Sequence, residues 1–198
     1  MSGKPSVIVL AGPNGAGKST LAPVLLRGKL GVTEFVNADV IARGLSAFDP
    51  NRVALQAGRI MLERLRELAR QRLTFAFETT LASRSFAPWI AQLIKGGYRF
   101  RLTFIWLPDA EMALQRVRDR VLFGGHDVAA ETVRRRYSAG VRNFLELYRP
   151  LVDSWRFYDN SVGQQMRLIA VGRRMIVRHV TDAETWNRIT ATPGKAQG

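Results

Sequence analysis

The feature that most constrains the fold is a glycine-rich segment behind a short apolar run. Residues 12–19 read Gly-Pro-Asn-Gly-Ala-Gly-Lys-Ser and match G-x-x-x-x-G-K-[ST] at every fixed position. The apolar run Ser6–Ala11 precedes them, and Lys18–Arg27 has the composition of a helix, which is the strand–loop–helix context that a phosphate-binding loop requires. We therefore expect a buried parallel strand at residues 6–11 with a nucleotide-binding loop at its carboxyl end.

The residue types in this loop suit phosphate binding. Glycines let backbone N–H groups close around phosphate oxygens, and the start of the following helix adds partial positive charge. Lys18 would reach the β- and γ-phosphates and Ser19 would coordinate Mg²⁺, so ATP and Mg²⁺ are the expected cofactors. Thr20 is a further hydroxyl without a separate role. The predicted cofactor-binding residues are Gly12, Pro13, Asn14, Gly15, Ala16, Gly17, Lys18, Ser19 and Thr20, with Ser19 as the metal ligand.

Apolar runs alternate with amphipathic segments along the chain, which predicts an α/β fold whose parallel sheet is covered by helices on both faces. Further strands are expected at 34–37, 73–77, 98–107 and 155–158, and helices at 51–72, 84–95, from 109 onward and at 131–149. Met166–Val171 and Met175–Val180, joined at Gly172-Arg173, predict a β-hairpin, and a short helix follows. We expect one domain over residues 1–198, with its core at 6–161 and the hairpin and helix at 166–190.

Composition excludes several classes of protein. The chain is 46% hydrophobic, enough to bury a core, so a disordered chain is excluded. It has no Cys, which rules out disulfides, thiolate metal sites and cysteine catalysis, and two histidines leave little for a zinc site. No apolar run is long enough to span a bilayer and no signal-peptide pattern is present. The cytoplasm is therefore the expected compartment.

The charge balance is strongly basic. Thirty Lys and Arg residues against sixteen Asp and Glu give a formal net charge of +14, and most of the thirty are Arg. Arginine binds phosphate and carboxylate well, so an anionic partner is indicated: a nucleotide, a nucleic acid or an acidic protein. A solvated basic surface explains the same charge. The longest basic run is Arg134–Arg136, which argues against a dedicated nucleic-acid arm.

Asp39 follows the second expected strand, at the sheet edge where ligands bind in doubly wound folds. A carboxylate there can accept the proton of an acceptor hydroxyl or hold magnesium through water. The alternative is that Asp39 caps a helix at 40–43.

Two further strand ends carry polar residues. Glu78 suits a contact to metal-bound water or to an acceptor hydroxyl, and Thr80, more than Thr79, suits hydrogen bonding to a polar substrate. The alternative is a capped turn. Residues 159–161, Asp-Asn-Ser, lie where a nucleotide base could bind, although an ordinary turn would explain them equally well.

A third cluster of arginines flanks the break at residues 123–127. A lid at 123–136 that carries arginines would stabilise the negative charge of phosphoryl transfer. We favour Arg120 and Arg134, followed by Arg118 and Arg136, because helical spacing places them beside the apolar stripes. The same spacing predicts that Arg116 and Arg135 point outward. A solvated basic face is the alternative, and His126 is given no role.

These segments together resemble the zeta toxin-like P-loop kinases. The resemblance spans Ser6 to Ser161 and rests on GPNGAGKST, FVNADVIA, FAFETTLA, the Gly-Gly-His break with Arg-Arg-Arg, and Tyr-Asp-Asn-Ser. It implies a nucleoside-kinase-like fold and ATP-dependent phosphorylation of a hydroxyl, which in zeta toxins belongs to a UDP-N-acetylamino sugar. The implied roles are ATP and Mg²⁺ binding for Lys18 and Ser19, general base for Asp39, acceptor binding for Glu78 and Thr80, and charge stabilisation for Arg120 and Arg134.

The sequence thus predicts a short, stand-alone phosphotransferase that uses ATP and Mg²⁺ and acts on a hydroxyl of a small molecule. A nucleotide sugar is one candidate acceptor, and an acidic antitoxin is one candidate partner. Two alternatives stay open. A polynucleotide-end kinase would use the positive charge to follow a phosphate backbone. A non-catalytic nucleotide-binding module of a toxin–antitoxin pair would bind nucleotide without turnover.

Overall fold

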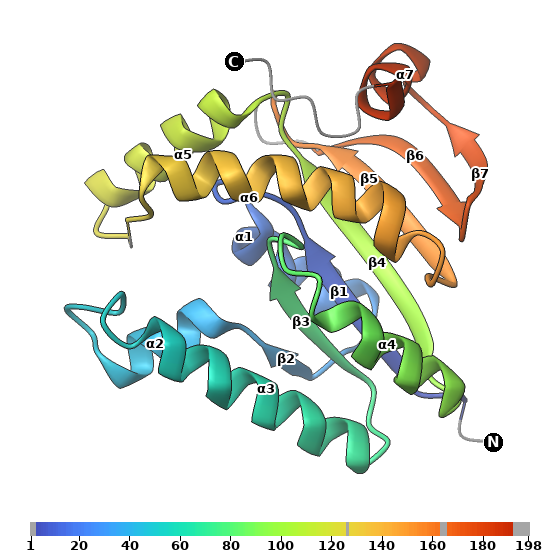
Figure 1. Cartoon of the computed structure of the whole chain (residues 1–198), viewed down its shortest axis with the longest axis horizontal. Helices are drawn as coiled ribbons and strands as arrows, with labels where there is room; N and C mark the ends of the chain where they lie inside the picture. The colour runs from blue at the N-terminus through green and yellow to red at the C-terminus, as the bar shows by residue number, and fades with distance from the viewer. Residues whose placement is uncertain (1–2, 126, 163–165, 192–198) are drawn as a thin grey trace.

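The computed structural model describes residues 3–125, 127–162 and 166–191 (Figure 1). Strands and helices alternate through most of the chain, with two π-helical segments, η1 and η2, that continue α1 and α6. The elements are β1 (Ser6–Ala11), α1 (Lys18–Ala22), η1 (Pro23–Lys29), β2 (Glu34–Val36), α2 (Ala38–Leu45), α3 (Ala54–Arg70), β3 (Phe75–Thr79), α4 (Phe86–Lys95), β4 (Arg99–Trp106), α5 (Ala110–Leu122), α6 (Ala130–Asn143), η2 (Phe144–Tyr148), β5 (Ser154–Asp159), β6 (Arg167–Arg173), β7 (Ile176–Val180) and α7 (Ala183–Ala191).

The strands form one sheet in the order β2-β3-β1-β4-β5-β6-β7. The pairs among β2, β3, β1, β4 and β5 are parallel, and β6 and β7 are added antiparallel at one edge. Because β1 is central, all six of its residues are buried, which explains its continuous apolar sequence. The predicted α/β fold with a carboxyl-terminal hairpin is confirmed.

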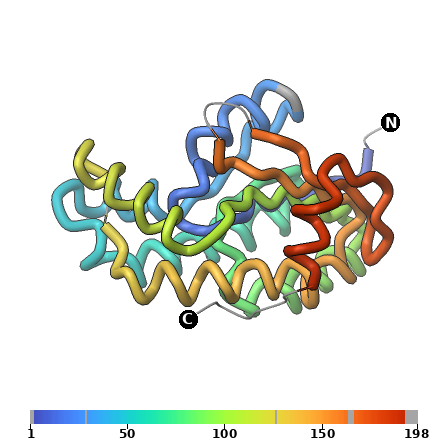
Figure 2. The backbone as a smooth tube through the Cα atoms, turned by 90° about the horizontal axis from the view of Figure 1, so that it is seen from above, coloured from blue at the N-terminus to red at the C-terminus, as the bar shows by residue number. Residues whose placement is uncertain are grey.

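Helices cover both faces of the sheet, as the view from above shows (Figure 2). One apolar cluster joins the strand residues around Val9 and Phe104 to α3, α4, η2 and α7. The other joins Leu10 and Ile105 to α1, η1 and α5. The alternation of side chains along β1 and β4 therefore sends neighbouring residues into two separate cores.

Three predicted elements need correction. β3 runs to Thr79, so Glu78 and Thr79 lie inside the strand, opposite Leu10 and Ala11 of β1. The predicted helices at 18–27 and 131–149 each become π-helical in their second part. In the first of them the change begins at Pro23, which has no N–H for the α-helical ladder.

The hairpin turn was predicted two residues too early. Gly172 and Arg173 belong to β6, and the chain reverses at Arg174, whose φ is +48°. A Cβ at Gly172 would clash with the ring of Trp155. This glycine therefore permits a close approach between β5 and β6 and does not mark a turn.

α5 ends at Leu122 and α6 begins at Ala130, and the predicted Arg134–Arg136 part of the lid lies on α6. His126 lies outside the described residues. Within the part of the chain that the structure describes, no helix combines the length and apolarity needed to cross a membrane.

Candidate active site

The glycine-rich loop is held against its neighbours in a way that only glycine permits. Gly12, Gly15 and Gly17 have φ angles of +145°, +76° and +84°. A Cβ at Gly12 would clash with the carbonyl oxygen of Ile105, and one at Gly15 would lie 2.8 Å from that of Ala113. The loop therefore packs directly on the backbone of β4 and α5, where a side chain would not fit.

Lys18 is buried at the start of α1. Its Nζ donates to the carbonyl oxygen of Pro13 at 2.8 Å and lies 3.7 Å from Oε1 of Glu78. Burial lowers the pKa of Lys18, the charges of Glu78 and Asp39 oppose that shift, and the charge of Arg120 adds to it. The carboxylates of Glu78 and Asp39 therefore help to keep this buried ammonium charged.

Glu78 joins three elements at one edge of the sheet. Ser19 Oγ donates to its carboxylate at 2.9 Å and 3.1 Å, and Asn37 Nδ2 donates to it at 2.8 Å. This convergence follows from the register, because the arrowheads of β1 and β3 point to the same edge, where α1 begins (Figure 1). The predicted residues Lys18, Ser19 and Glu78 are thus brought together.

Asn37 is a member of the site that the sequence interpretation missed. Its Oδ1 accepts from the backbone N–H groups of Asp39 at 2.8 Å and Val40 at 3.2 Å, so Asn37 caps α2. Asp39 is therefore not the cap, and its exposed carboxylate lies in the first turn of the helix. Asparagine is among the most favoured N-caps, and its place just before the helix was the available signal.

The arginines of α5 and α6 lie in different surroundings. Arg116, predicted to point outward, is half-buried: its Cβ lies against Gly15 and its Nη2 donates to the carbonyl oxygen of Ser161 at 3.2 Å. That prediction was wrong, because the absent side chain of Gly15 lets α5 approach the loop with its Ala113–Arg116 face. Arg118 is exposed.

Arg120 and Arg134 do not share one environment. Arg120 is half-buried and close enough to Lys18 to lower the pKa of that lysine. Arg134 is exposed and forms an ion pair with Glu111 at 2.8 Å, a contact that raises the pKa of Arg134. The structure thus brings Arg120 toward the loop and holds Arg134 between α5 and α6. Of the flanking arginines, Arg135 is exposed and Arg136 is half-buried.

Two other strand ends border the site. The carbonyl oxygen of Thr80 would lie 2.5 Å from a Cβ at Gly140, so α6 crosses the chain here. Asn160 Nδ2 donates to the carbonyl oxygen of Ala16 at 2.9 Å, which ties the end of β5 to the loop. Asp159 is buried and accepts from Ser161 and Arg167.

The loop fits a nucleotide with a magnesium ion. Asn14 is buried and its amide oxygen has no hydrogen-bond partner among the described residues, so the loop has bonding capacity that its own fold does not use. No group of three or more acidic or histidine side chains within the described ranges could hold a metal alone. Mg²⁺ commonly takes few protein oxygens together with substrate phosphates, and the Ser19 hydroxyl and Glu78 carboxylate suit that arrangement.

Comparison with known proteins agrees with this geometry. Residues 7–142, from β1 to near the end of α6, match the model of the AAA domain family AAA_33. The chain belongs to this family. Another protein, from Haemophilus influenzae (strain ATCC 51907 / DSM 11121 / KW20 / Rd) and described only as uncharacterized, is 29% identical over 130 residues, which are 66% of this chain and 91% of that protein.

Solved structures share the AAA-family fold of this chain at low identity. The AvrRxo1-ORF1:-ORF2 structure with ATP has a TM-score of 0.76 at 20% identity, covering 98% of this chain and 66% of that chain. The PezAT toxin–antitoxin system of Streptococcus pneumoniae has a TM-score of 0.65 at 16% identity, covering 95% and 79%. A gluconokinase from Sinorhizobium meliloti has a TM-score of 0.51 at 17% identity, covering 82% and 86%. This chain thus has a P-loop kinase-like fold, and it spans just under two thirds of the AvrRxo1 chain's length.

Proposed function

We propose that this protein is an ATP- and Mg²⁺-dependent phosphotransferase that resembles zeta toxins and acts on a hydroxyl of a small molecule. A UDP-N-acetylamino sugar is the first candidate acceptor. The observation that carries the proposal is the cluster of Lys18, Ser19 and Glu78 at the carboxyl ends of β1 and β3. Asp39 is close enough to act on the charge of Lys18.

Each residue has a role that its surroundings support. Lys18 would hold the β- and γ-phosphates, and Glu78 fixes the Ser19 hydroxyl, which would coordinate the metal. Bound Mg²⁺ and ATP would supply charge neutralisation and the phosphoryl group. The contacts of Glu78 favour this metal-side role over the acceptor contact that the resemblance implies.

Asp39 and the nearby polar residues face the acceptor in this proposal. The exposed Asp39 carboxylate accepts the proton of the acceptor hydroxyl, and Thr80 provides a hydrogen bond to the same molecule. Arg120 stabilises the charge on the transferred group. Arg134 would reach that group only by leaving Glu111.

A second protein chain fits this proposal as a regulator. The AvrRxo1 structure contains an ORF1:ORF2 pair and PezAT is a toxin–antitoxin system. By analogy, and because the chain carries a net charge of +14, an acidic antitoxin is the partner that we propose.

ADP release from Mg-ATP, with and without UDP-N-acetylglucosamine, tests the proposal. We expect the sugar to stimulate ADP release by the wild type and Lys18→Ala to abolish it. Arg135→Ala is the matched control, because Arg135 is exposed and is predicted to point outward, and we expect full activity from this variant. ATP hydrolysis at the same rate with and without the sugar would reject this acceptor. ADP release by Lys18→Ala equal to that of the wild type would reject phosphotransfer at this loop.

A further inference from the structure

The sheet has a hollow on the face that carries Ile8. Near the loop this face is covered by η1 and α5, which pack on Leu10 and Ile105. Further toward the amino ends of the strands lies a hollow of about 230 Å³ whose described lining comes from β1, β4, β5, β6 and β7, with Leu30 as the one residue from outside the strands. α7 and η2 pack on the opposite face of these strands.

Four arginines from four successive strands line this hollow: Arg101, Arg156, Arg173 and Arg178. Hydroxyl groups alternate with the first two, because Arg101 pairs in register with Ser154 and Thr103 pairs with Arg156. Arg156 also pairs with Val171 and Arg173 with Ile176, so neighbouring arginines are offset along the strands and the four form a staggered row across the sheet. We call these four residues the arginine row.

Carboxylates do not balance the arginine row. Among the described residues, no acidic side chain forms an ion pair with any of the four. The neighbouring Asp153 offers Arg173 only its backbone oxygen, at 3.1 Å, while its carboxylate accepts from the backbone N–H of Phe100 at 2.8 Å. A hollow whose charged lining is all of one sign attracts ligands of the opposite charge, so the unbalanced row favours an anion.

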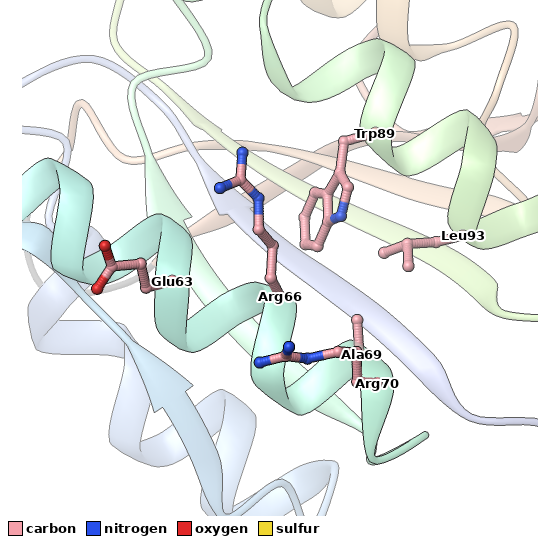
Figure 3. Close-up of a pocket in the computed structure, with 6 residues that line it drawn as sticks. All are labelled: Glu63, Arg66, Ala69, Arg70, Trp89 and Leu93. Atoms are coloured by element: carbon pink, nitrogen blue, oxygen red, sulfur yellow. The ribbon is translucent and has the colours of Figure 1, made fainter.

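A larger hollow gives the contrast. It measures about 630 Å³ and lies between α3 and α4; Arg66 and Arg70 line it, and Arg66 lies beside Trp89 (Figure 3). Glu63 lines it too, so its charges are mixed. The hollow that holds the arginine row is smaller, but the charged side chains that line it are all positive.

We propose that the arginine row binds the sugar-phosphate backbone of a single-stranded nucleic acid. Guanidinium groups form paired hydrogen bonds to phosphate, and the Thr103 and Ser154 hydroxyls add neutral donors. A row across four strands matches the repeated charges of a polymer better than one phosphate group. A hollow of about 230 Å³ in the sheet surface suits a flexible single strand, which can bend into it, better than a stiff duplex. The site is separate from the nucleotide-binding loop and goes beyond the proposed phosphotransferase.

Fluorescence anisotropy with labelled oligodeoxythymidylate and oligouridylate, over a range of salt concentrations, tests the proposal. We expect binding that weakens with salt and survives both saturating Mg-ATP and Lys18→Ala. Each phosphate contact contributes about 0.7 to the slope of log K against log salt. Arg101→Gln/Arg156→Gln should therefore reduce the slope by about 1.4 and weaken binding at least tenfold at low salt.

Arg66→Gln/Arg70→Gln is the matched control, because it removes the same charge from the other hollow. We expect this control to change the slope less than Arg101→Gln/Arg156→Gln does. Equal loss in both double variants would mean diffuse attraction to a basic protein and would overturn the proposal. So would a loss confined to the control, or binding to polyglutamate with none to either oligonucleotide, which would indicate an acidic protein partner. Arg178→Gln, at an edge strand, repeats the test if the double variant does not fold.

Discussion

The sequence predicts the site residues at the strand ends beside the glycine-rich loop more accurately than it predicts the arginines of α5 and α6. At the strand ends, Lys18, Ser19 and Glu78, chosen from motif and position, are in direct contact. On α5 and α6, the favoured Arg134 lies in a surface ion pair, while the dismissed Arg116 lies against the loop.

The difference has a physical cause. Parallel strands in register bring their carboxyl ends to one edge, so the neighbours of a strand-end residue follow from the order of strands. The direction of an arginine on a helix depends on how far that helix is rotated about its axis, which packing decides. Predictions for strand ends are therefore firmer than predictions for helix faces in this fold.

The largest expected effect lies at the strand ends. Asp39→Asn removes the proposed base without a change of shape. We expect turnover to fall by about 10²–10⁴ while Mg-ATP affinity is kept, measured by ADP release and calorimetry. Turnover equal to that of the wild type would remove Asp39 from the base role.

A smaller effect is expected at Asn37, which links α2 to Glu78. Asn37→Asp keeps the cap oxygens but loses the Nδ2 donor to Glu78. We expect activity to fall about tenfold, as for partners that orient a metal-site ligand. Asn37→Ala loses both contacts, so its activity should fall further than that of Asn37→Asp.

The control for Asn37 is another helix cap, away from the loop. Asp182 accepts from the backbone N–H of Thr185 at the start of α7. Asp182→Ala should lower the melting temperature slightly and leave activity unchanged. If both variants lose activity in proportion to stability, Asn37 has a structural role only.

The smallest expected effect compares two arginines of α5. Arg116→Ala loses the bond to Ser161 beside the loop, so Mg-ATP affinity should fall about fivefold, the value of one net hydrogen bond of about 1 kcal/mol. Arg118→Ala should leave the affinity unchanged, because Arg118 is exposed. A larger loss of affinity in Arg118→Ala than in Arg116→Ala would support the sequence-based prediction, in which Arg118 faces the site and Arg116 points outward.

Some features could be predicted from sequence and others could not. The loop motif and the continuous apolar run of β1 predicted the sheet and its binding edge, and Glu78 followed from its strand. Asn37 had a usable capping signal that a search for charged groups passed over. Arg116 could not be placed, because its position depends on a contact with Gly15, about a hundred residues away. The arginine row depends on the pairing of four strands, which no local pattern reveals.

Calorimetric titration of Mg-ATP into the wild type, Lys18→Ala and Arg134→Ala tests the central claim most directly. The claim is that the nucleotide is bound at the strand ends and not by the exposed α6 arginine. We predict that Lys18→Ala lowers the affinity at least tenfold, as expected for a lost charged contact, and that Arg134→Ala leaves it within about twofold of the wild type. Equal affinities for wild type and Lys18→Ala, or a larger loss in Arg134→Ala, would contradict the account.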